Sequence, residues 1–487
     1  MAASVGATGT NDRYAGWSTE MQAGARTSPN TRRASSPPIP AAVMVCQAIL
    51  RYAVERIRMD PPPLDGPRSE AELRAMAGHT ITDAGIGGLE ALRVFGDVLA
   101  PACISVDHPA YLSFVPVAPT EAAILFDLVV GASSIYGGSW LEGAGAVFAE
   151  NEALRWLADL AGLPSGTGGV FVAGGSAGNL SGLVAARHVW RSAAPDRERR
   201  RAAIVASRSA HSSIVSAARV MDADIIGVPV DARACLTGEA VRTVLDGLAP
   251  EDAERVVAVV ATAGTTNAGI VDDLEGTGTI ARQRGYWFHV DAAYGGGALA
   301  APSARSLFDG VELADSLVID PHKWLFAPFD CAALLYRHPE AARAAVTQPA
   351  EYLDTLTGRP EWNPSDYAYH LTRRARGLPF WFSLATHGTR AYARAVEDTL
   401  QLTRDVAELI RVMPHVELVL EPELSVVLFR RLGWRHDEYE RWSAQALADG
   451  LTLTMPSSWA GETVLRFCFV NPRTTVADVE AILASMA

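Results

Sequence analysis

The sequence of 487 residues has few cysteines, no long apolar run and almost no lysine. Its five cysteines are scattered and free of CxxC spacing, so we expect a reduced protein without a metal site. No run approaches the roughly 20 apolar residues of a membrane-spanning helix, and the N-terminus lacks the cationic start and apolar core of a secretory signal. We therefore expect a cytoplasmic protein that has no membrane partner.

Positive charge is also scarce, because 42 lysines and arginines face 55 acidic residues and give a net charge of −13. The basic residues form no stripe that would neutralise phosphates, which argues against nucleic acid as a partner. A hydrophobic fraction of 49% excludes a disordered or collagen-like chain. A chain of this length and composition is typical of a globular protein with more than one domain.

Lys323 is the single lysine of the chain, beside 41 arginines. A coding bias explains the arginines but does not explain why one lysine remains. Arginine stays protonated, whereas the amine of lysine can form a Schiff base. The count alone fits chance retention as well as catalysis, so the residues around Lys323 must decide.

The patterning predicts four segments. Residues 1–40 are rich in small and polar residues and indicate a disordered tail, and residues 41–118 form an N-terminal helical segment, with an apolar stripe from Ala41 to Arg58. In residues 119–385, short apolar runs alternate with helical stretches, which predicts an α/β domain with a mainly parallel sheet. Residues 386–487 predict a smaller α/β domain with strands near Val416–Leu420, Ser425–Arg430 and Leu465–Val470.

The expected strands of the large domain are Gly169–Ala173, Ala202–Ala206, Ile225–Val230, Val256–Thr262, Trp287–Val290, Leu317–Ile319 and Ala332–Tyr336. A glycine-rich turn, Gly174–Asn179, follows the first of them and opens a helical stretch. Backbone N–H groups at a helix start bind phosphate, although such turns also serve packing alone. The turn lacks the GxxxxGK[ST] and GxGxxG patterns, which excludes a nucleotide site of either kind.

Two further strands end in reactive side chains. Asp291 ends the expected strand Trp287–Val290, and Lys323 follows Leu317–Ile319. Ligands bind at the carboxyl edge of such sheets, so the turn, the acid and the amine should meet there. Pyridoxal 5′-phosphate needs these three parts: N–H donors for its phosphate, an anion for its pyridine nitrogen and an amine for its aldehyde.

The motifs GGSxxN, AHSS, TxGTTxxGxxDD, HVDAAYGG and DPHKW occur in this order. Together they resemble the pyridoxal-phosphate-dependent amino-acid decarboxylases of the aromatic-L-amino-acid decarboxylase (group II) family, over roughly residues 100 to 470. The resemblance implies the aspartate-aminotransferase-like fold (fold type I), a homodimer with active sites at the subunit interface, and release of carbon dioxide from an amino acid.

By the same resemblance, Lys323 forms the Schiff base, Asp291 pairs with the pyridinium, and Gly175 and Ser176 hold the phosphate. His211 stacks on the cofactor ring and addresses the substrate carboxylate; a lone histidine of this kind would otherwise be structural. Four other expected cofactor residues are Ala293 on the opposite ring face, Thr266, Asp272 and His322. Asp320 stands where relatives often carry asparagine, and its charge would repel a phosphate.

The polar, proline-punctuated stretch from Arg337 to Asp366 is interpreted as a lid. Tyr352 in it resembles the family tyrosine that protonates the substrate carbon from the neighbouring subunit. Some aldehyde-forming relatives carry phenylalanine there, so Tyr352 favours an amine as product. Two alternatives stay open: decarboxylation coupled to oxidative deamination that gives an aldehyde, and a catalytically silent scaffold that binds the cofactor.

The resemblance also predicts the walls of a substrate pocket, although these residues would equally suit a core: Tyr111, Phe114, Pro116, Val117, Tyr136 and Gly138. Val117 replaces a common threonine of the aromatic-specific relatives, and Gly138 replaces a bulky aromatic residue. No positive group is clearly placed for a side-chain carboxylate. We therefore expect an uncharged substrate, either an aromatic or a bulky aliphatic L-amino acid.

Overall fold

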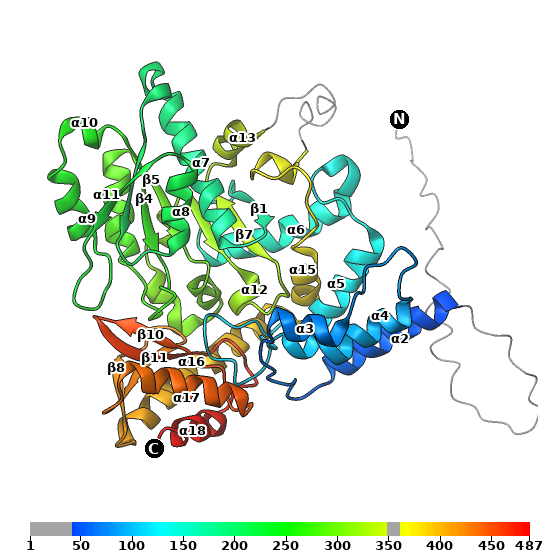
Figure 1. Cartoon of the computed structure of the whole chain (residues 1–487). Coiled ribbons are helices and arrows are strands. Elements are labelled where there is room, and N and C mark those ends of the chain that lie inside the picture. Colours follow the sequence, from blue (N-terminus) through cyan, green and yellow to red (C-terminus); the bar gives the residue numbers. More distant parts are fainter. Residues whose placement is uncertain (1–40, 348–360) are drawn as a thin grey trace, which may run out of the picture. The chain divides into compact units, whose positions relative to one another are not determined.

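A computed structural model describes residues 41–347 and 361–487 (Figure 1). The expected tail of residues 1–40 and the candidate acid Tyr352 lie outside these ranges. The chain divides into two units, Met1–Ala53 and Val54–Ala487. Helix α2 (Ala41–Ile57) agrees with the predicted apolar stripe. No helix in the described ranges is long and apolar enough to cross a membrane.

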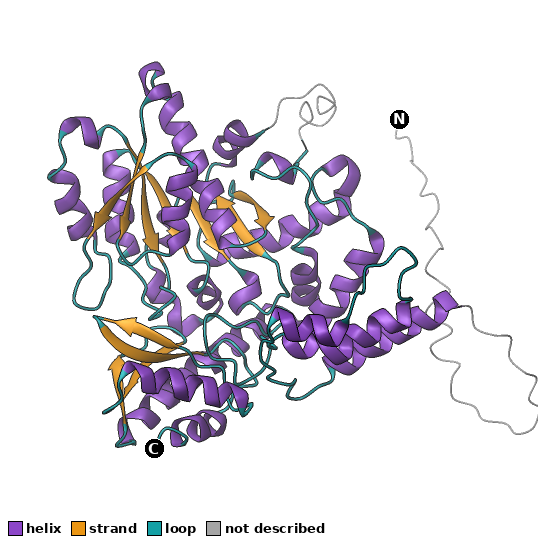
Figure 2. Ribbon diagram, viewed as in Figure 1, coloured by secondary structure: helices purple, strands orange, loops and turns teal. Residues whose placement is uncertain are grey.

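Within the described residues, the large sheet has seven strands in the order β1-β7-β6-β5-β4-β2-β3 (Figure 2). β7 is antiparallel to both of its neighbours, and the pairs from β6 to β3 are all parallel. The predicted α/β fold with a mainly parallel sheet is confirmed. The strands are β1 (Gly168–Val172), β2 (Ala203–Ser207), β3 (Asp224–Val228), β4 (Val256–Thr262), β5 (Trp287–Asp291), β6 (Ser316–Ile319) and β7 (Ala332–Tyr336).

Apolar packing covers both faces of this sheet. In β2, Val205 belongs to one core cluster and its neighbour Ile204 to another, because successive side chains of a strand point to opposite faces. The first cluster includes residues of α6 (Trp140–Leu160), α9 (Gly238–Asp246) and α11 (Leu274–Arg284). The second includes residues of α7 (Gly175–Ser192) and α8 (Ser212–Val220). This burial explains why the strands read as continuous apolar runs.

A second, antiparallel sheet has the order β10-β11-β9-β8. Its strands are β8 (Val416–Leu420), β9 (Val426–Arg431), β10 (Pro456–Trp459) and β11 (Glu462–Cys468). Apolar residues of α16 (Thr389–Val412) and α18 (Val476–Ala484) share a core cluster with β9 and β11, and α17 (His436–Ala448) adds Tyr439 to it. β10 was not predicted, since its sequence PSSW lacks an apolar run.

The remaining helices are α3 (Glu70–Ala77), α4 (Gly88–Val94), α5 (Glu121–Ser133), α10 (Pro250–Ala253), α12 (Pro321–Trp324), α13 (Pro339–Val346) and α15 (Leu378–His387). α13 differs from the expectation of an irregular lid, because regular structure continues to Val346. Arg343 on this helix pairs with Asp366 at 3.3 Å between Nε and Oδ2. Residues 337–347 therefore form part of the ordered framework.

A buried ion pair fixes the strand that leads into the glycine-rich turn. Arg373 donates to both carboxylate oxygens of Glu150, at 2.7 and 2.9 Å, and to the carbonyl of Phe171 in β1 at 3.1 Å. Both side chains are almost fully buried. Removing one partner of such a pair costs about 3–5 kcal/mol, so the pair contributes to the position of β1.

Candidate active site

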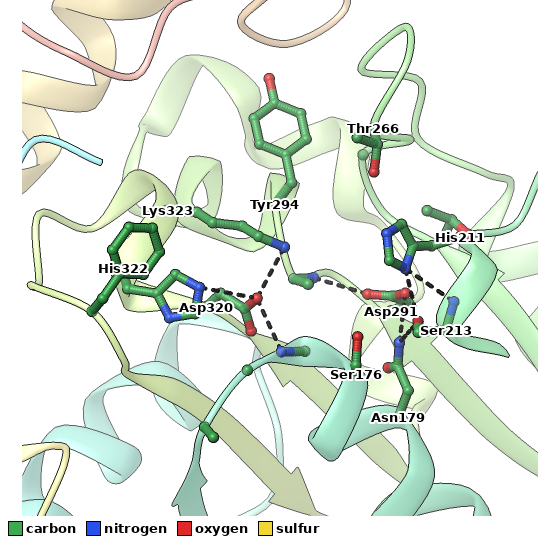
Figure 3. Close-up of a pocket in the computed structure, with 17 residues that line it drawn as sticks. Ser176, Asn179, His211, Ser213, Thr266, Asp291, Tyr294, Asp320, His322 and Lys323 are labelled. Atoms are coloured by element: carbon green, nitrogen blue, oxygen red, sulfur yellow. Dashed lines mark hydrogen bonds and ion pairs between the residues drawn. The ribbon is translucent and has the colours of Figure 1, made fainter. Parts of the chain in front are cut away.

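The carboxyl ends of β1, β4, β5 and β6 meet at a cavity of about 260 Å³ (Figure 3). The turn after β1 supplies Gly174, Gly175 and Ser176, and β5 supplies Asp291. Lys323 reaches the cavity from α12, directly after β6. The three groups that the sequence placed at one sheet edge thus line one cavity.

Gly175 begins α7 and lies too close to its neighbours to carry a side chain. A Cβ atom there would lie 2.9 Å from Cβ of Ala293 and 3.0 Å from Oδ2 of Asp320. The backbone N–H of Gly175 donates to that Asp320 oxygen at 3.1 Å. A helix start without a side chain leaves room for a bound anion to approach the backbone, as a phosphate group requires.

Asp291 is a buried carboxylate at the edge of the cavity. Its Oδ2 accepts a hydrogen bond from Nδ2 of Asn179 at 2.8 Å, and its Oδ1 accepts one from the backbone of Ala293 at 3.2 Å. These hydrogen bonds fix the orientation of the carboxylate. A fixed negative charge at this place suits a protonated pyridine nitrogen.

A chain of buried hydrogen bonds fixes the amide of Asn179. Trp287 Nε1 donates to Ser316 Oγ at 2.7 Å, Ser316 Oγ lies 2.7 Å from His289 Nδ1, and His289 Nε2 lies 2.9 Å from Asn179 Oδ1. Burial lowers the pKa of His289 to about 4, so the ring is neutral. It then carries its proton on Nε2 and donates it to Asn179, which leaves the amide nitrogen facing Asp291.

His211 caps α8 and belongs to the same network. The backbone N–H of Ser213 donates to His211 Nδ1 at 3.2 Å, and Ser213 Oγ lies 2.8 Å from that nitrogen. Ser213 Oγ in turn accepts from Asn179 Nδ2 at 2.9 Å. Because Nδ1 accepts the backbone N–H of Ser213, a ring proton of His211 lies on Nε2, which takes no part in this network.

Lys323 forms an ion pair at the opposite side of the cavity. Its Nζ lies 2.9 Å from Oδ2 of Asp320. Burial lowers the pKa of the Lys323 amine, but the charge of Asp320 and the hydrogen bond to it outweigh burial and raise this pKa above its usual value. His322 accepts from the backbone of Cys331 at Nδ1, and burial lowers its pKa.

Of the other predicted cofactor residues, Thr266, Ala293 and His322 line the cavity, whereas Asp272 does not. The Asp272 carboxylate accepts from the backbone of Leu236 at 2.8 Å and of Thr262 at 2.7 Å. Burial raises its pKa to about 7 in spite of these bonds. Asp272 thus lies behind the cavity and holds the end of β4.

None of the six predicted pocket residues is among the described residues that line this cavity. Tyr111 packs with Leu64 and Leu453, and Phe114 is exposed. Pro116 and Val117 are buried elsewhere. Tyr136 donates from its hydroxyl to the carbonyl of Leu371, and its ring fills the space that a side chain at Gly138 would need. Their role at the substrate stays a prediction.

Sequence reasoning did not select several side chains that line the cavity, among them Asn179, Ser213, Tyr294 and Phe329. Asn179 and Ser213 stand inside the motifs GGSxxN and AHSS, so the motifs themselves were the signal. The Tyr294 hydroxyl lies 2.5 Å from Ser425 Oγ, and its ring stacks on Trp324 with centroids 5.4 Å apart. It therefore joins the end of β5 to the small sheet.

Residues 89–432 match the pyridoxal-dependent decarboxylase conserved domain. The chain belongs to this family. It is a pyridoxal-phosphate-dependent amino-acid decarboxylase, as the motifs predicted. The aromatic-L-amino-acid decarboxylase of Bacillus atrophaeus is 28% identical over 78% of this chain and 80% of its own length. The L-2,4-diaminobutyrate decarboxylase of Rhizobium meliloti is 30% identical over 83% of this chain and 82% of its own length.

Solved structures share the fold. The structure of Oryza sativa TDC with PLP and tryptamine aligns with a TM-score of 0.82 at 24% identity, over 92% of this chain and 96% of that chain. Rhodiola rosea 4-hydroxyphenylacetaldehyde synthase aligns with a TM-score of 0.80 at 21% identity, over 91% and 96%. The predicted fold type is thereby confirmed.

The residues of the cavity fit pyridoxal phosphate. Gly175 lacks the Cβ atom that would crowd the start of α7, where a phosphate can bind, Asp291 provides a buried carboxylate, and Lys323 provides the only lysine amine of the sequence. Their arrangement at one sheet edge is the arrangement that this cofactor needs.

Proposed function

We propose that the chain converts an uncharged aromatic or bulky aliphatic L-amino acid into its amine and carbon dioxide. The observation that carries this proposal is the meeting of Gly175, Asp291 and Lys323 in one cavity. The rings of Tyr294 and Phe329 also line the cavity, and no arginine does so within residues 41–347 and 361–487. This lining favours an uncharged side chain over one with a carboxylate.

When bound, the cofactor supplies an electron sink for the carbon that loses carbon dioxide. Gly175 and Ser176 would bind its phosphate, and the Lys323 amine would hold its aldehyde group. Asp291 would pair with the pyridine nitrogen, and the amide of Asn179 holds the Asp291 carboxylate in place. These roles orient the substrate and stabilise the charge that develops during carbon dioxide loss.

His211 has a separate role in this proposal. Its Nδ1 is held by Ser213, so Nε2–H is left to donate to the substrate carboxylate or to contact the cofactor ring. Tyr352, outside the described residues, remains the proposed acid that protonates the substrate carbon from the neighbouring subunit. A tyrosine at this position supports an amine as the product.

We also propose a homodimer with shared sites. Large apolar side chains of two helices in unit Val54–Ala487 are exposed in the single chain: Leu125, Leu128 and Val129 of α5, and Leu141 and Phe148 of α6. Apolar patches of this kind mark association surfaces. Light scattering after size exclusion should give the mass of two chains, and a monomeric active enzyme would contradict the shared site.

One substrate panel tests the proposed reaction. The purified holoenzyme is incubated with neutral aromatic, neutral aliphatic, acidic and basic L-amino acids, including L-2,4-diaminobutyrate, because relatives named for both aromatic and diaminobutyrate substrates are similar to this chain. Carbon dioxide, amine, aldehyde, ammonia and peroxide are measured together. We expect carbon dioxide and amine in equal amounts from a neutral amino acid.

The other outcomes separate the alternatives. Aldehyde, ammonia and peroxide would identify decarboxylation coupled to oxidative deamination. Preference for diaminobutyrate or glutamate would overturn the proposed substrate class. Binding of cofactor without carbon dioxide release from any amino acid would leave a silent scaffold as the remaining reading.

A further inference from the structure

Asp320 is a buried acid that the proposed chemistry does not use. It follows β6 and precedes Pro321, and its side chain is 1% exposed. Its Oδ2 lies 2.9 Å from Lys323 Nζ and accepts from Gly175 N at 3.1 Å (Figure 3). Oδ1 is buried and has no hydrogen-bond partner in the described part of the chain. One carboxylate oxygen therefore holds two groups of the cofactor site.

A phosphate that accepted a hydrogen bond from the Gly175 N–H would need the place that this oxygen takes. The Gly175 N–H opens α7, where the partial positive charge of the helix start attracts anions. In the structure, this N–H already binds the anion Asp320. An asparagine here would place an uncharged amide at the same distance.

We propose that Asp320 is an internal counter-anion that competes with the cofactor phosphate for the N–H of Gly175. It also holds the Lys323 ammonium until Lys323 reacts. This inference rests on the proposed roles of Gly175 and Lys323. Asp320 is thus a positioning residue: it stabilises the empty site and opposes the entry of an anion.

The surrounding charges support this competition. Lys323 is the cation in hydrogen-bond distance of Asp320. The nearest histidine nitrogen, Nε2 of His322, lies 3.7 Å from Oδ2, which is too far for a hydrogen bond. If Oδ2 releases Gly175 to a phosphate, two anions share a buried space, and like charges at such distances repel strongly. Removing the charge of Asp320 should therefore strengthen phosphate binding.

The test uses the purified enzyme from which the cofactor has been removed by hydroxylamine and dialysis. The dissociation constants of inorganic phosphate and of pyridoxal phosphate are measured by calorimetry, and cofactor uptake is followed by absorbance. We expect Asp320→Asn to bind both ligands about tenfold more tightly or better, and to take up the cofactor faster. A purely structural role of Asp320 would not strengthen the binding of a small anion.

Asp315→Asn is the matched control. Asp315 is a largely buried acid of the same domain that accepts from the backbone of Phe288 at 2.8 Å and does not line the cavity. Its substitution should leave phosphate affinity unchanged. Circular dichroism verifies the fold of each variant, and Asp320→Ser replaces Asp320→Asn if the latter is unfolded.

If the Asp320 variants bind phosphate as tightly as the unaltered protein or more weakly, the proposal that Asp320 competes with the phosphate is wrong. Failure of the unaltered protein to bind either ligand would instead remove the proposed phosphate site itself. The two failures are distinguishable because only the second involves the unaltered protein.

Discussion

Asn179 donates one N–H to Asp291 at 2.8 Å and the other to Ser213 at 2.9 Å. The first bond reaches the acid proposed for the pyridine nitrogen, and the second reaches the serine that holds His211. One side-chain amide thus orients Asp291 directly and His211 through Ser213. Its own orientation is fixed because neutral His289 donates to its oxygen.

Asn179→Asp should lower kcat/KM by about 100-fold, which corresponds to about 2.7 kcal/mol. The new carboxylate would lie at hydrogen-bond distance from Asp291, and the two acids would share a proton, so Asp291 would lose charge. Steady-state kinetics on the best substrate of the panel measure the effect. Asn151→Asp, on α6 and outside the cavity lining, is the control. Unchanged kinetics of Asn179→Asp would contradict the orienting role.

Two neighbouring glycines offer a matched pair of variants for the phosphate site. Gly175→Ala would bring Cβ to 2.9 Å from Ala293 and 3.0 Å from Asp320, whereas Gly174→Ala would meet no atom within 4 Å. We expect Gly175→Ala to weaken pyridoxal phosphate binding by at least about tenfold, or about 1.4 kcal/mol. Gly174→Ala should bind as the unaltered protein does. Titration of the cofactor-free protein measures both, and equal affinities of the two variants would place the phosphate elsewhere.

Stability should fall in acid because of His289. Its pKa is about 4 in the folded protein against 6.5 for an ordinary histidine, so the unfolded chain binds more protons between these values. The neutral His289 ring makes its full contribution to the free energy of unfolding above about pH 6.5. This contribution is lost as the pH falls to about 4, which lowers the free energy of unfolding by about 3 kcal/mol. Asp272, with a pKa raised to about 7, acts in the opposite direction, so variants must be compared with the unaltered protein.

The variant His289→Gln separates the pH-dependent stability due to His289 from that of other groups, because glutamine keeps a hydrogen-bond donor for Asn179 and does not titrate. The difference in unfolding free energy between the unaltered protein and His289→Gln should shift by about 3 kcal/mol between pH 6.5 and pH 4. Urea unfolding at several pH values measures it. His436→Gln, at an exposed histidine, should show no such shift. A constant difference for His289→Gln would refute a neutral buried ring.

Lys323→Arg should keep the positive charge beside Asp320 but lose the Schiff base, since guanidinium is not an amine nucleophile. We expect kcat to fall by at least about 1000-fold, or about 4 kcal/mol, while the melting temperature changes little. Borohydride treatment of the holoenzyme should label a single peptide that contains Lys323. Arg284→Lys, which adds an exposed amine, tests that the label follows the imine and not mere accessibility. A label elsewhere would refute the assignment.

The large sheet could be predicted because its strands are buried on both faces. Each strand is therefore a continuous run of apolar residues, such as Val256–Thr262, that can be recognised in the sequence. β10 could not be predicted, because its four residues PSSW are mostly half-buried and form no apolar run. They form a strand by pairing with β11. α13 was missed because prolines and charges around it resemble a loop. The hydrophobic pattern of a segment indicates which of its residues are buried. It does not indicate which distant segments they contact.

The same limit applies to the site. Topology alone brings Asp291 and Lys323 to one edge, so these residues were accessible to reasoning from the sequence. The hydrogen bonds of Asn179 and His289 depend on side-chain orientation across three elements, which spacing does not contain. The sequence indicated only that Asp320 would repel a phosphate if it faced one, and the structure shows that its carboxylate accepts from the N–H of Gly175. Thr266 lines the cavity but Asp272 does not. Both residues belong to the motif TxGTTxxGxxDD, so the motif alone did not separate them.

The lone lysine has a consequence for the outside of the molecule. Every other basic side chain is an arginine, and Lys323 lies largely buried in its ion pair with Asp320. Acylating reagents and amine cross-linkers therefore find a single ε-amine, that of Lys323, whose side chain is only 26% exposed. Lysine acetylation and ubiquitin attachment therefore have no lysine side chain to modify apart from Lys323.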